Sequence, residues 1–219
     1  MHAYKILLYI LYTAELTACI CGFASWYKWK GSPWRWFSFY LLFIVLSEAF
    51  GEYTYRYKLS DARDFFFNYI NIPAQFFIAF YIFYRVGENK TARVLPLICA
   101  GIYITSWLAN KLYLGQQWYS LSYTTGNLLL LVLILRFLLA LASSKEILNF
   151  KRNILFWICT GWMLYYLGTL PYYGLRNTLA EKYYDLFVSY SYVVQTLNIT
   201  MYLLFSVGFL WSKPRSAYS

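Results

Sequence analysis

Long apolar stretches alternate along this chain with short clusters of polar and charged residues. A helix that crosses a membrane needs about 20 mostly apolar residues, and seven stretches of that length are bounded by Lys, Arg, Gly or Pro residues. We expect an integral membrane protein of the all-α class, built as a bundle of seven transmembrane helices. The predicted spans run from Ile6 to Tyr27, Phe37 to Tyr57, Phe66 to Val86, Val94 to Tyr113, Leu121 to Ser143, Ile154 to Tyr173 and Leu186 to Trp211.

The composition supports a membrane environment. Of the 219 residues, 61% are hydrophobic and 13% are charged, and the mean hydropathy is +0.45. Aromatic residues make up 24% of the chain, and Tyr and Trp gather where a membrane meets water. Because seven spans use nearly the whole sequence, we expect a single transmembrane domain over residues 1–219, with the lipid bilayer as its main partner.

The basic residues predict an orientation. The formal net charge is +10, which by itself also fits a nucleic-acid partner, but the basic residues lie in short loops between spans. With seven spans, four basic clusters fall on one side, whereas acidic residues dilute the bases on the other. Since cytoplasmic loops are enriched in Lys and Arg, we predict an external N-terminus, a cytoplasmic C-terminus and no nucleic-acid binding. The four clusters are Lys28, Lys30 and Arg35; Arg85, Lys90 and Arg93; Lys145, Lys151 and Arg152; and Lys213 and Arg215.

Few ionisable residues fall inside the predicted spans. Glu15 lies in the first span, Glu48 and Glu52 in the second and Arg136 in the fifth. Such groups are unfavourable in hydrocarbon unless they are paired or hydrated, which makes each a functional candidate. Glu48 and Glu52 are four residues apart on one helix face, about 6 Å along the axis, so the sequence predicts that they share a proton. The proton-coupling candidates are Glu15, Glu48 and Glu52.

Side-chain amides form a second polar set. Asn68, Asn71 and Gln75 share one face of the third span, and Pro73 predicts a kink or a locally opened backbone there. Later spans add more amides, most of them in the middle or outer half of the predicted bundle. We expect an outward-facing polar pocket, although such amides also join helices through hydrogen bonds of about 1 kcal/mol each. The predicted ligand-binding residues are Glu48, Glu52, Asn68, Asn71, Gln75, Asn127, Gln195 and Asn198.

Several catalytic arrangements are missing from the sequence. The single histidine, His2, lies outside the spans, and the seventh span contains no lysine that could hold a retinal. There is also no glycine-rich phosphate loop and no pair of intramembrane aspartates. We therefore predict no catalytic residues, no metal and no cofactor, and the sequence favours a protein that is not an enzyme.

The sixth span carries a motif that resembles a known type of membrane protein. Phe156-Trp157-Ile158 is followed by Gly161, Tyr165, Tyr166 and Gly168. Together with the face of Asn68 and Asn71, this motif resembles small bacterial proteins with seven transmembrane helices, some relatives of which are sensory input modules of histidine kinases. The resemblance implies a bacterial inner-membrane location and a separate cytoplasmic signalling partner.

A more distant similarity is to membrane hydrolases of the lysoplasmalogenase type. Those enzymes have eight spans and intramembrane aspartates. This chain has seven predicted spans, and the acidic residues within them are glutamates. The leading hypothesis is therefore a receptor-like or sensory protein that binds a small ligand or a proton in its outward-facing pocket. A small proton-coupled transporter and a lipid-modifying enzyme of the lysoplasmalogenase type are the alternatives.

Overall fold

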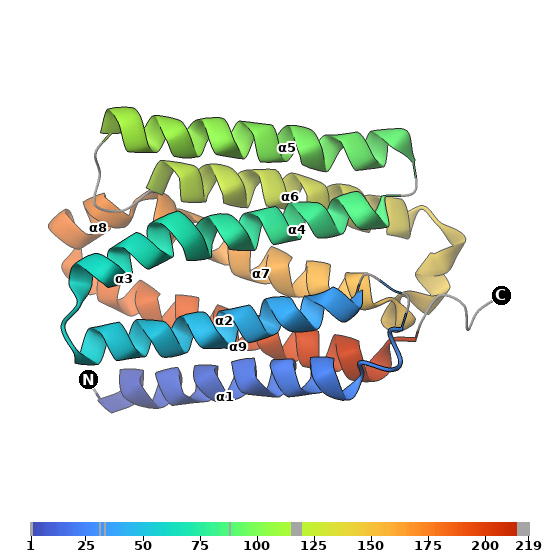
Figure 1. Ribbon diagram of the computed structural model, residues 1–219, viewed down its shortest axis with the longest axis horizontal. Coiled ribbons are helices and arrows are strands. Elements are labelled where there is room, and N and C mark those ends of the chain that lie inside the picture. Colours follow the sequence, from blue (N-terminus) through green and yellow to red (C-terminus); the bar gives the residue numbers. More distant parts are fainter. Residues whose placement is uncertain (1, 31, 33, 88, 115–119, 214–219) are drawn as a thin grey trace. The chain divides into compact units, whose positions relative to one another are not determined.

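A computed structural model describes residues 2–30, 32, 34–87, 89–114 and 120–213 of the protein. Within these residues every regular element is a helix, and there is no strand (Figure 1). The chain divides into two compact units. The first is formed by described residues of Met1–Leu42 and Ile134–Ser219, and the second by those of Phe43–Leu133. The helices α2 (Trp34–Arg56) and α6 (Ser120–Ala142) therefore contribute to both units.

The first unit is built around a close antiparallel pair of helices, α7 and α9, which lie side by side in Figure 1. A Cβ atom added to Gly161 of α7 would lie 3.2 Å from the main-chain oxygen of Met201 in α9. One added to Gly168 would lie 2.5 Å from Leu197. The residue numbers therefore rise along α7 while those of the contacted residues fall along α9, so the two helices are antiparallel. Glycine at such positions allows two transmembrane helices to approach closely. The other helical elements of this unit are α1 (His2–Ala24), η3 (Lys145–Arg152) and α8 (Arg176–Lys182), beside α7 (Ile154–Gly174) and α9 (Tyr184–Trp211).

The core of the first unit is aromatic. Trp162 of α7 has no exposed surface, and its ring lies edge-on to the ring of Phe37, with centroids 5.8 Å apart. It also packs against Phe205 of α9 at 6.2 Å and against Tyr40 at 6.4 Å. Side chains from α2, α7 and α9 thus interlock around one buried tryptophan.

A lysine outside the spans caps the end of α9. Nζ of Lys28 donates hydrogen bonds to the carbonyl oxygens of Phe209, at 2.8 Å, and Leu210, at 3.2 Å. The last carbonyls of a helix have no partner within the helix and carry its partial negative charge. Partial burial and, to a smaller extent, the charge of Lys213 lower the pKa of Lys28. The two hydrogen bonds offset this unfavourable environment for the cation.

We expect Lys28→Met to lower the free energy of unfolding by about 1 kcal/mol. Methionine retains the apolar stem but loses both donors to the end of α9. Denaturation in detergent micelles, followed by circular dichroism, measures the change. The exposed Lys30 is the matched control, and equal effects of Lys28→Met and Lys30→Met would show that the cap does not stabilise α9.

The second unit contains a helical hairpin. Its first arm is a continuous helical run, in which α3 and α4 are joined by η1, a single π-helical turn. The chain then turns at Gly87 and returns through α5, and the ring contacts of Tyr103 with Phe76 and Phe80 show that the arms pack against each other. The hairpin consists of α3 (Ser60–Phe66), η1 (Phe67–Asn71), α4 (Ile72–Val86), α5 (Lys90–Ala109) and the π-helical η2 (Asn110–Leu114).

All seven stretches predicted as spans coincide with long helical runs in the structure. Six runs in the described residues are long and apolar enough to cross a membrane, as is typical of a multi-pass membrane protein. The exception is α2, which contains Glu48, Glu52 and Arg56 and is the least apolar of the helices of 20 or more residues. The seventh span and the orientation of the chain stay predictions. The short helices α3 and α8 and the 3-10 segment η3 lie mainly in stretches that the sequence predicted as short loops between spans.

Candidate functional site

The predicted amide face of the third span coincides with the π-helical turn η1. Asn68 and Asn71 lie in this turn and are buried, and Pro73 follows two residues later. A proline ring clashes with the carbonyl four residues earlier and has no N–H to donate, and a π-turn widens the helix at such a place. Single π-turns occur often at functional sites. The turn lies where the sequence predicted a locally opened backbone.

Neighbouring side chains hold this turn in place. Nε2 of Gln75 donates a hydrogen bond to Oδ1 of Asn71 at 3.0 Å. The indole N–H of Trp107 in α5 donates to the main-chain oxygen of Asn68 at 3.4 Å. The second π-turn, η2, begins at Asn110, three residues after Trp107. Both wide turns therefore lie at the same end of the hairpin.

A phenylalanine joins this hairpin to α6. The ring of Phe76 lies 5.0 Å from the ring of Tyr103 in α5 and 5.8 Å from that of Tyr123 in α6, measured between centroids. A Cβ atom added to Gly126 would lie 2.6 Å from the Phe76 ring, so α6 approaches α4 closely at this glycine. Asn127, the next residue, has no exposed surface. The packing thus places a buried amide of α6 beside the contact with α4.

Three buried polar groups of this unit have no hydrogen-bond partner among the described residues. They are both amide atoms of Asn110, both amide atoms of Asn127 and the hydroxyl of Tyr103. Burying such a group without a partner is unfavourable by about 1–3 kcal/mol in proteins, and native structures keep few of them. Amides and a phenol can both donate and accept hydrogen bonds. Such a group of side chains suits the binding of a small polar molecule.

The two carboxylates of α2 each have a basic neighbour. Glu52 forms a salt bridge with Arg56, with Oε1 2.8 Å from Nε, and both side chains are partly exposed. Arg63 lies close enough to Glu48 for its charge to act on the carboxyl group. The pair of Glu52 and Arg56 could have been predicted from the sequence, because the two residues are four apart on one helix. The position of Arg63 near Glu48 could not, because it depends on how α3 folds back. The sharing of a proton by Glu48 and Glu52 stays a prediction.

The remaining predicted residues belong to the first unit. Gln195 is partly buried and donates from Nε2 to the hydroxyl of Tyr4 at 3.3 Å, and Asn198 of the same helix is partly buried. Glu15 is 3% exposed and lies on the face of α1 that also carries the buried Leu11 and Ala18. The structure therefore gathers six of the eight predicted ligand-binding residues into the second unit and assigns Gln195 and Asn198 to the first.

The prediction of binding residues omitted Asn110 and Tyr103. Tyr103 could have been recognised from the sequence as a candidate, because it lies in the middle of a mostly apolar span and a buried tyrosine hydroxyl needs a hydrogen-bond partner. The part of the chain that the structure describes contains no group of three or more His, Cys, Asp or Glu side chains able to hold a metal ion.

The long apolar helices define the class of this protein as a multi-pass helical membrane protein, and its second unit contains several buried amides. Comparison with known proteins adds no relative, because no family model, curated protein or solved structure matches the chain.

Proposed function

We propose that the protein is a receptor-like or sensory protein of the cell membrane that binds a small polar ligand at the amides of its second unit. In this proposal the chain crosses a bacterial inner membrane seven times, with its N-terminus outside and its C-terminus in the cytoplasm. The observation that carries the proposal is Asn127, which is fully buried and has neither amide atom paired among the described residues. A ligand that accepts from and donates to this amide would satisfy both atoms.

The wide turns η1 and η2 provide a route for the signal. Each π-turn has one residue more per hydrogen-bonded ring than the α-helix around it, and converting it to an α-turn would shift the adjoining helix. Asn71 lies in η1 and Asn110 in η2, so a ligand that bound both amides would act on both arms of the hairpin. The shift would then reach a cytoplasmic partner docked on the basic loops.

We expect Asn127→Leu to abolish ligand binding without lowering stability. Leucine has the same number of side-chain heavy atoms and the same branching as asparagine but needs no hydrogen bond, so the free energy of unfolding should stay the same or rise by about 1 kcal/mol. Native mass spectrometry of protein released from mild detergent should detect a small-molecule adduct on the parent chain and none on the variant. A denaturant titration of both proteins measures the change in stability.

The control is Asn149→Leu, which changes an exposed amide and should keep the adduct. If Asn127→Leu instead lowered stability by 2 kcal/mol or more and left the adduct pattern unchanged, Asn127 would be a structural bridge and the proposal would be lost. The transporter alternative depends on Glu48 and Glu52, of which Glu52 is paired with Arg56. It predicts uptake driven by a pH gradient that stops in Glu48→Gln.

A further inference from the structure

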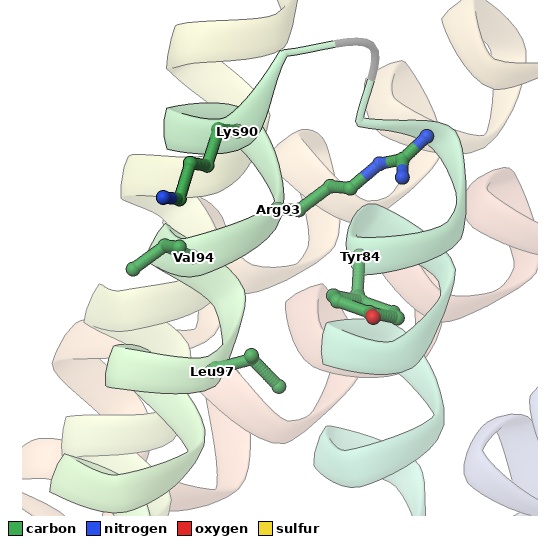
Figure 2. Close-up of a pocket in the computed structure, with 5 residues that line it drawn as sticks. All are labelled: Tyr84, Lys90, Arg93, Val94 and Leu97. Atoms are coloured by element: carbon green, nitrogen blue, oxygen red, sulfur yellow. The ribbon is translucent and has the colours of Figure 1, made fainter.

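A hollow of about 370 Å³ lies where α4 ends and α5 begins. Figure 2 shows Tyr84 on α4 and the other lining residues on the first turns of α5. Arg93 extends from α5 toward the end of α4, Lys90 lies beside Val94, and Leu97 lies one turn further along α5. The hollow therefore has a polar upper rim and an apolar lower part.

The rim is positively charged. Lys90 and Arg93 are both exposed, and the sequence from residue 84 to residue 97 contains three cations, with Arg85 as the third, against the single carboxylate of Glu88. Nε of Arg93 donates to the carbonyl oxygen of Gly87 at 2.8 Å, which fixes the guanidinium group beside the loop. Arginine and lysine side chains bind phosphate oxygens through charged donors, and a tyrosine hydroxyl can donate to them as well.

The lower part of the hollow is apolar and exposed. Val94 is 42% exposed and Leu97 is 56% exposed. Both lie in the candidate span Lys90–Leu112, and the partner arm is the candidate span Ser60–Val86. The hollow is thus at the ends of two spans, at the depth where lipid head groups meet the hydrocarbon. A free phosphate would leave Val94 and Leu97 uncovered, whereas a phospholipid would cover them with its acyl chain.

We propose that this hollow binds an anionic phospholipid, with its phosphate between Lys90 and Arg93 and an acyl chain along Val94 and Leu97. The site is separate from the buried amides and goes beyond the proposed ligand binding. Basic pockets beside transmembrane helices bind acidic head groups through the same combination of charge and apolar contact. Anionic lipid is favoured over zwitterionic lipid because a choline would place a further positive charge near the two cations of the rim.

The experiment is a native mass spectrometry titration of the full chain in detergent with dioleoyl phosphatidylglycerol or dioleoyl phosphatidylcholine. We expect the parent to bind the anionic lipid about tenfold more tightly than the zwitterionic lipid. Lys90→Gln combined with Arg93→Gln should remove this preference. The matched control combines Lys5→Gln with Lys182→Gln, which removes the same charge from exposed positions outside the hollow. This control should retain the preference for the anionic lipid.

Two further measurements test the assignment. Because Arg93 also holds the loop, Lys90→Gln alone should weaken anionic-lipid binding by a factor of about three to ten without changing the melting temperature. Glycerophosphoglycerol, which is the head group without chains, should bind at least about tenfold more weakly than the intact lipid. Equal binding of both lipids, retention of the preference in the double variant, or head-group binding as tight as lipid binding would each overturn the proposal.

Discussion

Trp162→Ala is expected to lower the free energy of unfolding by about 3–5 kcal/mol. The side chain has no exposed surface and contacts aromatic rings from two other helices, Phe37 of α2 and Phe205 of α9. Truncation to alanine leaves a cavity that three rigid helices cannot close. In a membrane protein, where the hydrophobic effect does little to hold helices together, packing of this kind is a main source of stability.

The measurement is a denaturant titration in mixed micelles, followed by near-ultraviolet and far-ultraviolet circular dichroism. The control is Trp211→Ala in α9, where the tryptophan is 65% exposed and its loss should change stability by less than about 0.5 kcal/mol. Trp162→Phe should fall between the two, because it retains part of the ring contacts. A loss of stability as small for Trp162→Ala as for Trp211→Ala would show that the aromatic cluster does not hold the first unit together.

Gly126→Leu is expected to destabilise the second unit by about 3 kcal/mol. A Cβ atom at this position would lie 2.6–2.8 Å from three atoms of the Phe76 ring, well inside van der Waals contact. Phe76 is itself 2% exposed and packed against Tyr103, so its ring has little room to move away. Helix α6 would have to shift, and Asn127 would shift with it.

Two variants make this prediction specific. Gly101→Leu places the same side chain on α5 at a glycine whose added Cβ meets nothing within 4 Å, and it should not destabilise the protein. Combining Gly126→Leu with Phe76→Ala should recover much of the lost stability, because the smaller residue makes room for the leucine. If the double variant were less stable than either single variant, the contact between Gly126 and Phe76 would not be what limits the side chain at this position.

The second unit carries both proposed sites, and both use residues of its hairpin. Asn68 and Asn110 lie at one end, within the π-turns, and Lys90 and Arg93 lie at the other end, beside the connection of α4 and α5. The two sites call for different chemistry, since neutral amides suit a neutral polar ligand and the cations suit a phosphate. The two mass spectrometry experiments therefore test them independently.

The positions of the long helices could be predicted from the sequence because the length of an apolar run is a local property. Each of the seven predicted runs contains a helix, with ends displaced by a few residues where the chain turns, as it does at residues 25–30. The opened backbone near Asn71 could also be predicted, since Pro73 acts on its own helix. The weak point was α2, where Glu48 and Glu52 within an otherwise apolar run make the hydropathy ambiguous.

The partners of the polar side chains depended on the tertiary structure. Asn71 pairs with Gln75, four residues along the same helix, and this contact could be read from the spacing. Asn127 has an equally polar side chain, but its partners would have to come from other helices, and none among the described residues supplies one. The hollow at Arg93 likewise exists only because α4 and α5 meet there. The sequence by itself determined that this is a helical membrane protein with energetically unfavourable polar groups in its spans, because the length of an apolar run and the spacing of polar residues are local properties of the chain. Which of those groups stay without partners was decided by the tertiary structure, because a hydrogen bond between helices depends on their packing.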